Sequence, residues 1–172
     1  ISEGHTQYSP IKNIGDKTFP KYLLTFGEYF SQFINNNFIN SKNIFPIGHY
    51  YLENRVKNKV ATGCIDKIAL LKNIYKKIFL ISSQKIIEPE LLRLIIKLAK
   101  KHPEYCFIFK QRGALNLNCS HDNIIVESKY NIYDLMPFAD VHLSCFSTTI
   151  LESVASSNAL NVLIDINGLA SH

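Results

Sequence analysis

The stretch Val141-His-Leu-Ser-Cys-Phe-Ser-Thr-Thr-Ile-Leu-Glu152 joins an apolar run to a helical segment through a cluster of hydroxyl side chains. The apolar run predicts a buried strand, and the residues after it predict a helix. A helix start leaves backbone N–H groups unpaired and carries partial positive charge, so hydroxyls at this position suit a phosphate or another anion. The stretch therefore predicts a nucleotide-handling protein of the α/β class.

Apolar runs and helical patterns alternate along the rest of the chain. We expect strands over 22–26, 43–48, 77–82, 105–109, 123–126, 141–145 and 161–166, and helices over 27–37, 88–101, 132–138 and 149–156. Such alternation implies right-handed crossovers and a mostly parallel, Rossmann-like sheet with helices on both faces. In sheets of this kind, ligands lie beyond the carboxyl ends of the strands.

The formal charge of +5 comes from one segment of the chain. Residues 51–87 hold eight basic and two acidic residues, which gives +6. A solvated, lysine-coated helix explains this excess, and peripheral contact with an anionic membrane or a polyanionic acceptor is the alternative. Nucleic acid is not expected as a partner, because no aromatic-interleaved basic motif accompanies the charge.

Hydropathy, cysteine spacing and length indicate what kind of protein the chain belongs to and how much of it is present. No apolar run approaches the roughly 18 residues of a membrane-spanning helix. The cysteines Cys64, Cys106, Cys119 and Cys145 form no C-x-x-C pair, which favours buried, reduced thiols in a cytosolic protein. The chain starts at Ile1 and has six residues after its last apolar strand, so we interpret it as an excerpt of a longer protein.

The hydroxyl cluster has two interpretations. Thr149-Ile-Leu-Glu152 matches a capping box, in which Thr149 and Glu152 satisfy the N–H groups of their own helix. Capping does not account for Ser144, Ser147 and Thr148, which the predicted sheet places where a phosphate or ribose would lie.

Other polar residues follow strands at the same predicted edge. Lys110 and Arg112 follow an apolar strand and could neutralise a diphosphate, or could simply be solvated. Ser82 and Ser83 could offer hydroxyls to a ligand or cap the next helix.

Several common cofactor and metal motifs are missing from the sequence. Neither G-x-G-x-x-G nor the P-loop pattern occurs, which argues against a standard dehydrogenase and a P-loop NTPase. The histidines have no partners at metal-ligand spacing, so no metal site is predicted. His5, preceded by Gly4, is the one histidine that we consider for catalysis.

Several segments carry a resemblance to a known family. Tyr133-Asp-Leu-Met-Pro-Phe-Ala-Asp140 and Ser147-Thr-Thr-Ile-Leu-Glu-Ser153 are similar to its donor-site signature, and Lys42-Asn-Ile-Phe-Pro-Ile-Gly48 is similar to its crossover between domains. Lys77 to Ser83 and Phe107 to Lys110 resemble strands of its second domain. The order of these segments resembles the nucleotide-binding half of GT-B-fold enzymes, particularly bacterial surface-polysaccharide glycosyltransferases and the related UDP-sugar 2-epimerases.

The resemblance implies roles for individual residues. Ser147, Thr148 and Thr149 would bind the phosphates of the donor, and Lys110 or Arg112 would lie near its diphosphate. Glu152 would contact a ribose or sugar hydroxyl or brace the loop. The turn Ser2-Glu-Gly-His5 is similar to one at the domain cleft of such proteins, which would make His5 an acceptor-side base or positioning group. A nucleotide-sugar would be the substrate, with no further cofactor or metal.

The resemblance also implies a domain organisation and an activity. Residues 1–50 would end the first domain and form the crossover, residues 51–75 would be a basic linker carrying a helix, and residues 76–172 would form most of the nucleotide-sugar-binding domain. The expected activity is sugar transfer to a cell-surface polysaccharide or lipid-linked acceptor, in the cytoplasm near the inner membrane. The alternatives are a UDP-sugar 2-epimerase and a non-catalytic nucleotide-binding or scaffold domain.

Overall fold

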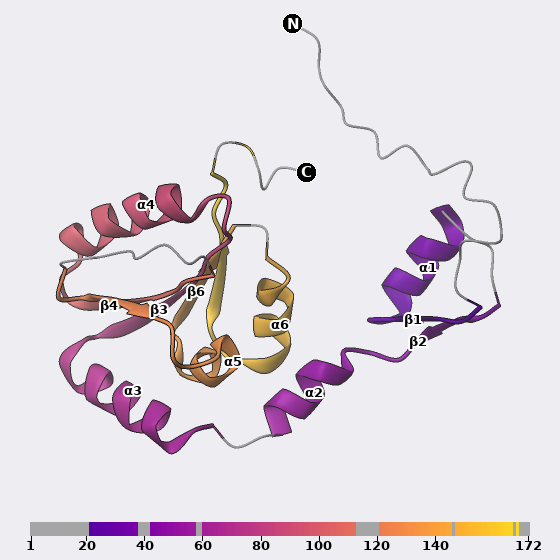
Figure 1. Ribbon diagram of the computed structural model, residues 1–172, viewed down its shortest axis with the longest axis horizontal. Coiled ribbons are helices and arrows are strands. Elements are labelled where there is room, and N and C mark those ends of the chain that lie inside the picture. Colours follow the sequence, from indigo (N-terminus) through magenta and orange to yellow (C-terminus); the bar gives the residue numbers. More distant parts are fainter. Residues whose placement is uncertain are drawn as a thin grey trace, which may run out of the picture. The chain divides into compact units, whose positions relative to one another are not determined.

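The computed structural model describes residues 21–37, 42–57, 60–112, 121–145, 147–166 and 168. The chain divides into two compact units, Ile1–Asn54 and Arg55–His172. Each unit contains its own parallel sheet (Figure 1).

The first unit contains a strand–helix–strand motif. Strand β1 (Leu23–Thr25) leads into helix α1 (Glu28–Asn37), and β2 (Ile44–Pro46) pairs parallel to β1. Thr25 Oγ1 lies 2.6 Å from Ser31 Oγ, so a buried hydrogen bond ties the end of β1 to α1. The motif confirms the strand, helix and strand that the sequence predicts here. Helix α2 (Tyr50–Lys57) follows and includes the boundary between the units.

The second unit is built on a five-stranded sheet in which every neighbouring pair is parallel. Its strands lie in the order β5-β4-β3-β6-β7. They are β3 (Lys77–Ser82), β4 (Tyr105–Lys110), β5 (Ile124–Glu127), β6 (Val141–Ser144) and β7 (Leu160–Leu163). All five strands are predicted from the apolar runs, with differences only at their ends.

Helices precede or connect these strands. They are α3 (Thr62–Ile74) before β3, α4 (Glu88–Lys101) between β3 and β4, α5 (Ile132–Leu135) with a 3-10 turn (Met136–Phe138) before β6, and α6 (Thr149–Ser156) between β6 and β7. In the described ranges, no helix is both long enough and apolar enough to cross a membrane.

The side chains of β3 alternate between two hydrophobic cores. Ile78 and Leu80 pack on one face of the sheet with Ile68 of α3, whereas Ile81 packs on the other face with Leu91 of α4. Figure 1 shows α4 on one side of the sheet and α3 with α5 on the other. A parallel strand that is covered on both faces needs apolar residues at successive positions, which explains its continuous apolar run. The Rossmann-like α/β fold with helices on both faces is confirmed.

Helix α3 packs against the sheet of the second unit, although the sequence leaves residues 51–75 as a linker carrying a helix. Cys64 and Ile68 are buried, but Leu70 and Ile74 are exposed, so the apolar residues of α3 do not form a single stripe. This arrangement explains the weak periodicity of the segment. Lys72 is exposed, as expected for a solvated basic surface, whereas Lys67 pairs with Glu127.

The described cysteines are buried free thiols, as the sequence predicts. Cys64, Cys106 and Cys145 are each at most 1% exposed. Burial raises the pKa of Cys106 to about 12, so its thiol stays protonated at neutral pH. Cys119 lies outside the described residues.

Asp140 joins three strands at the amino-terminal edge of the sheet. Its Oδ2 accepts a hydrogen bond from Ile78 N at 2.8 Å, and its Oδ1 accepts one from Lys77 Nζ at 3.2 Å. Its main chain bonds to Ile78 O and to Leu160 N, both at 2.9 Å. Burial raises the pKa of Asp140, but the bonds from Ile78 and Lys77 outweigh it, and the pKa lies below its ordinary value. Asp140 therefore has a structural role. It lies at the amino-terminal edge of the sheet, opposite to the predicted ligand edge.

Replacing Asp140 with alanine should lower the free energy of unfolding by about 2 kcal/mol, because the Ile78 N–H and the Lys77 ammonium lose a charged acceptor. Urea unfolding followed by circular dichroism measures the loss. The matched control is Asp66→Ala, which removes an exposed carboxylate from α3 and should change stability by less than about 0.5 kcal/mol. Equal losses in the two variants would contradict this role of Asp140.

Candidate functional site

The strand order reverses direction between β3 and β6. Chain order runs outward from β3 through β4 to β5 on one side, and from β6 to β7 on the other. Such a switch point opens a crevice beyond the carboxyl ends of the two central strands, and ligands of doubly wound sheets bind there. Ser82 ends β3 and Ser144 ends β6, and the two residues are paired in register. The predicted ligand edge therefore coincides with the switch point.

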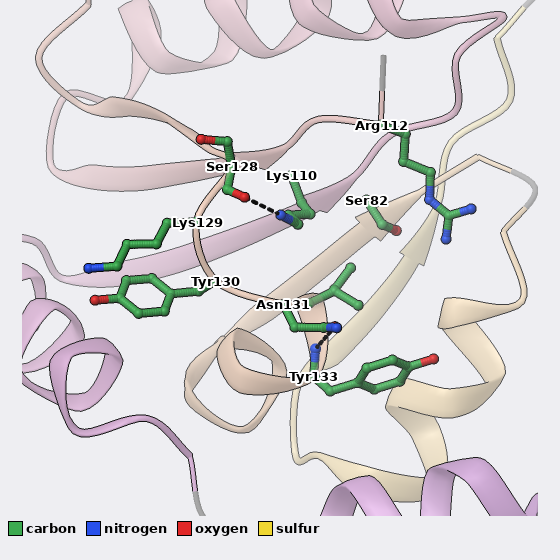
Figure 2. A pocket seen from close by; sticks show the side chains of 9 residues that line it. Ser82, Lys110, Arg112, Ser128, Lys129, Tyr130, Asn131 and Tyr133 are labelled. Atoms are coloured by element: carbon green, nitrogen blue, oxygen red, sulfur yellow. Dashed lines mark hydrogen bonds between the residues drawn. The ribbon is translucent and has the colours of Figure 1, made fainter. Parts of the chain in front are cut away.

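A cavity of 420 Å³ lies at this edge, over the ends of β3, β4 and β5 (Figure 2). Ligand pockets commonly enclose roughly 300–1,000 Å³. The described residues that line the cavity come from the strand ends and from the segment after β5: Ser82, Lys110, Arg112, Ser128, Lys129, Tyr130, Asn131, Ile132 and Tyr133. The described part of the lining includes three basic residues and no carboxylate, which suits an anion.

Lys110 and Arg112 give the cavity its charge. Lys110 Nζ donates to Glu127 O at 3.3 Å and to Ser128 O at 3.5 Å, and an ammonium with three N–H donors can also bind an anion. Arg112 is exposed, and its guanidinium can hold a phosphate through two parallel hydrogen bonds. Figure 2 shows Ser82 between these two side chains, with Lys129 and Tyr130 extending on the other side of Lys110.

A buried carboxylate fixes the main chain at Arg112. Glu88, at the start of α4, is fully buried, and its Oε1 accepts from Arg112 N at 2.8 Å and from Ser83 Oγ at 2.5 Å. Ser83 Oγ also contacts Lys110 O at 2.9 Å. Ser83 therefore links β3, β4 and α4 beneath the cavity and is absent from its described lining.

The hydroxyls on the β6 side bond to one another. Thr149 Oγ1 lies 2.9 Å from Ser82 Oγ and donates to Ser147 Oγ at 2.9 Å. Ser82 Oγ also lies 2.9 Å from Nε2 of the buried His142. Burial lowers the pKa of His142, so the ring is neutral near pH 7. Buried polar groups are stabilised by hydrogen-bond partners, and these hydroxyls already have such partners within the protein.

The start of α6 differs from the predicted capping box. The helix begins at Thr149, so Thr148 is the N-cap residue, and its side chain makes no capping bond. Ser147 supplies the acceptors instead, with its Oγ 3.3 Å from Thr149 N and its carbonyl oxygen 3.2 Å from Ile150 N. Thr149 does not cap because its hydroxyl is turned toward Ser82.

Glu152 is buried beside the cavity. Its Oε2 accepts from Tyr133 Oη at 2.8 Å. Tyr133 lines the cavity, so this bond connects α6 to the cavity wall. Among the hydroxyl residues predicted at this turn, Thr148 is the exposed one.

The structure groups the predicted site residues into two sets. Ser82, Lys110 and Arg112 line the cavity, while Ser83, Ser147, Thr149 and Glu152 form the buried bonds around it. Direct contact of Ser147, Thr148, Thr149 and Glu152 with a ligand stays a prediction. His5 lies outside the described residues.

The segment from Ser128 to Tyr133 supplies much of the cavity wall. Tyr133 belongs to the stretch that resembles a donor-site signature, whereas Tyr130 and Asn131 were not predicted as site residues. The available signal was their position after a predicted strand, at the same edge as Lys110. Asn131 Oδ1 accepts from Tyr133 N at 3.2 Å, and Asn131 N donates to Asp134 Oδ2 at 3.1 Å. These bonds form a capping box, which starts α5 and directs Tyr133 toward the cavity.

Glu127 anchors the beginning of this segment. Its carboxylate is 3% exposed and accepts from Lys67 Nζ, Lys129 N and Tyr130 N at 2.5, 2.6 and 3.0 Å. Burial raises the pKa of Glu127, but these three bonds outweigh burial and hold the pKa below its ordinary value. The carboxylate is therefore ionised at neutral pH and turned toward the main chain.

Replacing Thr149 with valine should lower the free energy of unfolding by about 1–2 kcal/mol, because the variant loses the hydroxyl that joins Ser82 to Ser147. Thr148→Val is a matched control one residue away, and because its side chain is exposed it should change stability by less than about 0.5 kcal/mol. Thermal and urea unfolding of both variants measure the difference. Similar stability of the two variants would contradict the buried bonding of Thr149.

The stabilising effect of Glu127 should depend on pH. Because folding lowers its pKa below 4.5, ionised Glu127 stabilises the fold above pH 4.5, and this contribution is lost as the pH falls through the lowered folded value. The difference in unfolding free energy between wild type and Glu127→Gln should therefore be full at neutral pH and shrink in acid. Urea unfolding over a pH series tests this, and a difference that does not change with pH would contradict it.

Comparisons with known proteins leave the family open. The chain matches no protein-family model, and no curated protein matches it. The geometry of the cavity and the residues at the switch point therefore carry the evidence for function.

Proposed function

We propose that the chain binds a nucleotide-activated sugar and belongs to a glycosyltransferase of the GT-B type. The observation that carries the proposal is the cavity at the switch point, whose described lining combines Lys110, Arg112 and Lys129 with no carboxylate. A diphosphate carries concentrated negative charge, and lysine and arginine are the side chains that bind it best. The segment resemblance supports the same ligand class.

The geometry supports a role for this cavity in stabilising a leaving group. In sugar transfer, an acceptor hydroxyl attacks the anomeric carbon, and the bond from that carbon to the phosphate oxygen breaks. The nucleotide departs with the bonding electrons, so negative charge develops on its phosphate. Lys110 and Arg112 would stabilise this charge, because their positions are fixed before the reaction. Glu88 fixes the main chain of Arg112, and two carbonyl oxygens orient Lys110.

The base, the sugar and the acceptor would contact other residues. Tyr133 offers an aromatic ring at the cavity wall, which suits stacking with a base or a sugar. The proposed acceptor is a cell-surface polysaccharide or a lipid-linked saccharide, and the proposed location is the cytoplasm near the inner membrane. His5 is the proposed acceptor-side base or positioning group. The acceptor, the location and the role of His5 come from the resemblance, whereas the role of Tyr133 comes from its place in the cavity wall.

Calorimetric titration with UDP-, GDP- and CMP-sugars tests the proposal. We expect one of them to bind, and Arg112→Met to weaken its binding about tenfold or more, because a charge-assisted contact to phosphate is lost. Lys97→Met is the matched control, since it removes an exposed positive charge from α4 and should leave the affinity unchanged.

The results of the titration and of an activity assay distinguish a glycosyltransferase, a 2-epimerase and a scaffold domain. Binding that Arg112→Met weakens, together with transfer of the sugar by the full-length protein, supports the glycosyltransferase. Binding followed by epimerisation of a UDP-sugar would point to the 2-epimerase. Absence of binding to every nucleotide-sugar would contradict the proposal and favour a scaffold domain.

A further inference from the structure

We propose that Lys67 and Glu127 form a positioning pair that shapes one wall of the cavity without touching the ligand. The pair lies between α3 and the end of β5, and neither residue is among those that line the cavity. Its effect on ligand binding rests on the proposed function. Its effect on the structure of the wall does not, so the two claims can fail separately.

Glu127 holds the cavity wall through both its side chain and its main chain. Its Oε1 accepts the N–H groups of Lys129 and Tyr130 at 2.6 and 3.0 Å, which turns the chain away from the direction of β5. Its carbonyl oxygen accepts from Lys110 Nζ at 3.3 Å. Three residues that line the cavity, Lys110, Lys129 and Tyr130, are therefore positioned by one glutamate.

Lys67 makes this arrangement stable. The Glu127 carboxylate is 3% exposed, and a buried carboxylate without a cation is strongly destabilising. Lys67 Nζ reaches Oε2 at 2.5 Å from a helix that lies 60 residues earlier in the chain. Lys67 is 35% exposed, so it brings the charge inward while part of its side chain remains solvated.

The same ammonium also contacts the aromatic residue of the wall. Lys67 Nζ lies 5.8 Å from the ring centre of Tyr130, and Lys129 Nζ lies 5.1 Å from it. Both distances suit cation–π interactions. Tyr130 is thus held by its main-chain bond to Glu127 and by two cations at its ring.

If Glu127 acted on the ligand only through its charge, the Glu127→Gln variant would bind anions differently from what a positioning role predicts. Glu127→Gln removes a negative charge close to the cavity, so a long-range field alone would strengthen anion binding. In glutamine one oxygen can still accept from Lys129 N and Tyr130 N, but the NH2 group is a donor and cannot accept from Lys67, so the pairing that holds the side chain in place is lost. Positioning therefore predicts weaker anion binding in Glu127→Gln, and the two roles differ in sign.

The first experiment examines the wall without ligand. Amide hydrogen exchange, measured by NMR on the full chain, should become about tenfold faster at Lys129 and Tyr130 in Lys67→Met. Amides in the central strands β3 and β4 should keep their protection. Lys67→Arg retains a cation that can bind the carboxylate and should restore slow exchange, and Lys72→Met on the same helix should have no effect. Unchanged exchange at Lys129 and Tyr130 in Lys67→Met would overturn the proposal.

The second experiment measures affinity for inorganic pyrophosphate by calorimetry. Lys67→Met and Glu127→Gln should both bind about tenfold more weakly than wild type, while Lys67→Arg and Lys72→Met should bind like wild type. Tighter binding by Glu127→Gln, or faster exchange with unchanged affinity, would overturn the positioning role. If wild type binds neither pyrophosphate nor a nucleotide-sugar, the proposed function fails, and hydrogen exchange still decides whether the pair holds the wall.

Discussion

The parallel register of β3 with its two neighbours is the constraint on which the site depends. Ser82 pairs with Lys110 on one side and with Ser144 on the other, and Lys110 pairs in turn with Glu127. Four polar residues therefore end their strands at the same level of the sheet. A shift of one residue in any strand would exchange its two faces and move its polar end away from this row. The apolar cores on both faces fix the register, and so they also fix the site.

The polar side chains on the two sides of the switch point have different partners. On the β6 side, Ser82, Thr149 and Ser147 bond to one another, so their hydroxyls stabilise the junction between the sheet and α6. On the β4 side, Lys110 and Arg112 face the cavity with donors that an anion can use. The charge that would hold a phosphate therefore comes mainly from cationic side chains beyond β4. The helix start contributes less, because Ser147 already accepts its first amides.

The sequence predicts the parts of this structure that depend on local pattern. Apolar runs locate the strands, and the acidic start, basic end and single apolar stripe of α4 locate that helix to the residue. Contacts between distant residues are not visible in such patterns. The capping box at Thr149 is absent because Ser82, 67 residues earlier, bonds to its hydroxyl. The place of Tyr130 in the cavity wall was not predicted, because it depends on the bond from its N–H to Glu127 and on the pairing of Glu127 with the distant Lys67. Lys110 and Arg112 were predicted because their position after a buried strand is itself a local signal.

Two buried glutamates hold the segments that carry two of the cations in the cavity wall. Glu88 bonds to the main chain of Arg112, and Glu127 bonds to the main chain of Lys129. Both carboxylates are turned toward N–H groups inside the protein, and neither belongs to the described lining of the cavity. The two side chains therefore order the segments that carry the cations without binding the cationic side chains that line the cavity. At Glu127, a neutral residue would bind the main-chain N–H groups more weakly, because hydrogen bonds to charged groups are the stronger ones. The two buried glutamates thus hold the main chain that carries Arg112 and Lys129, the cations that the proposed anion site needs.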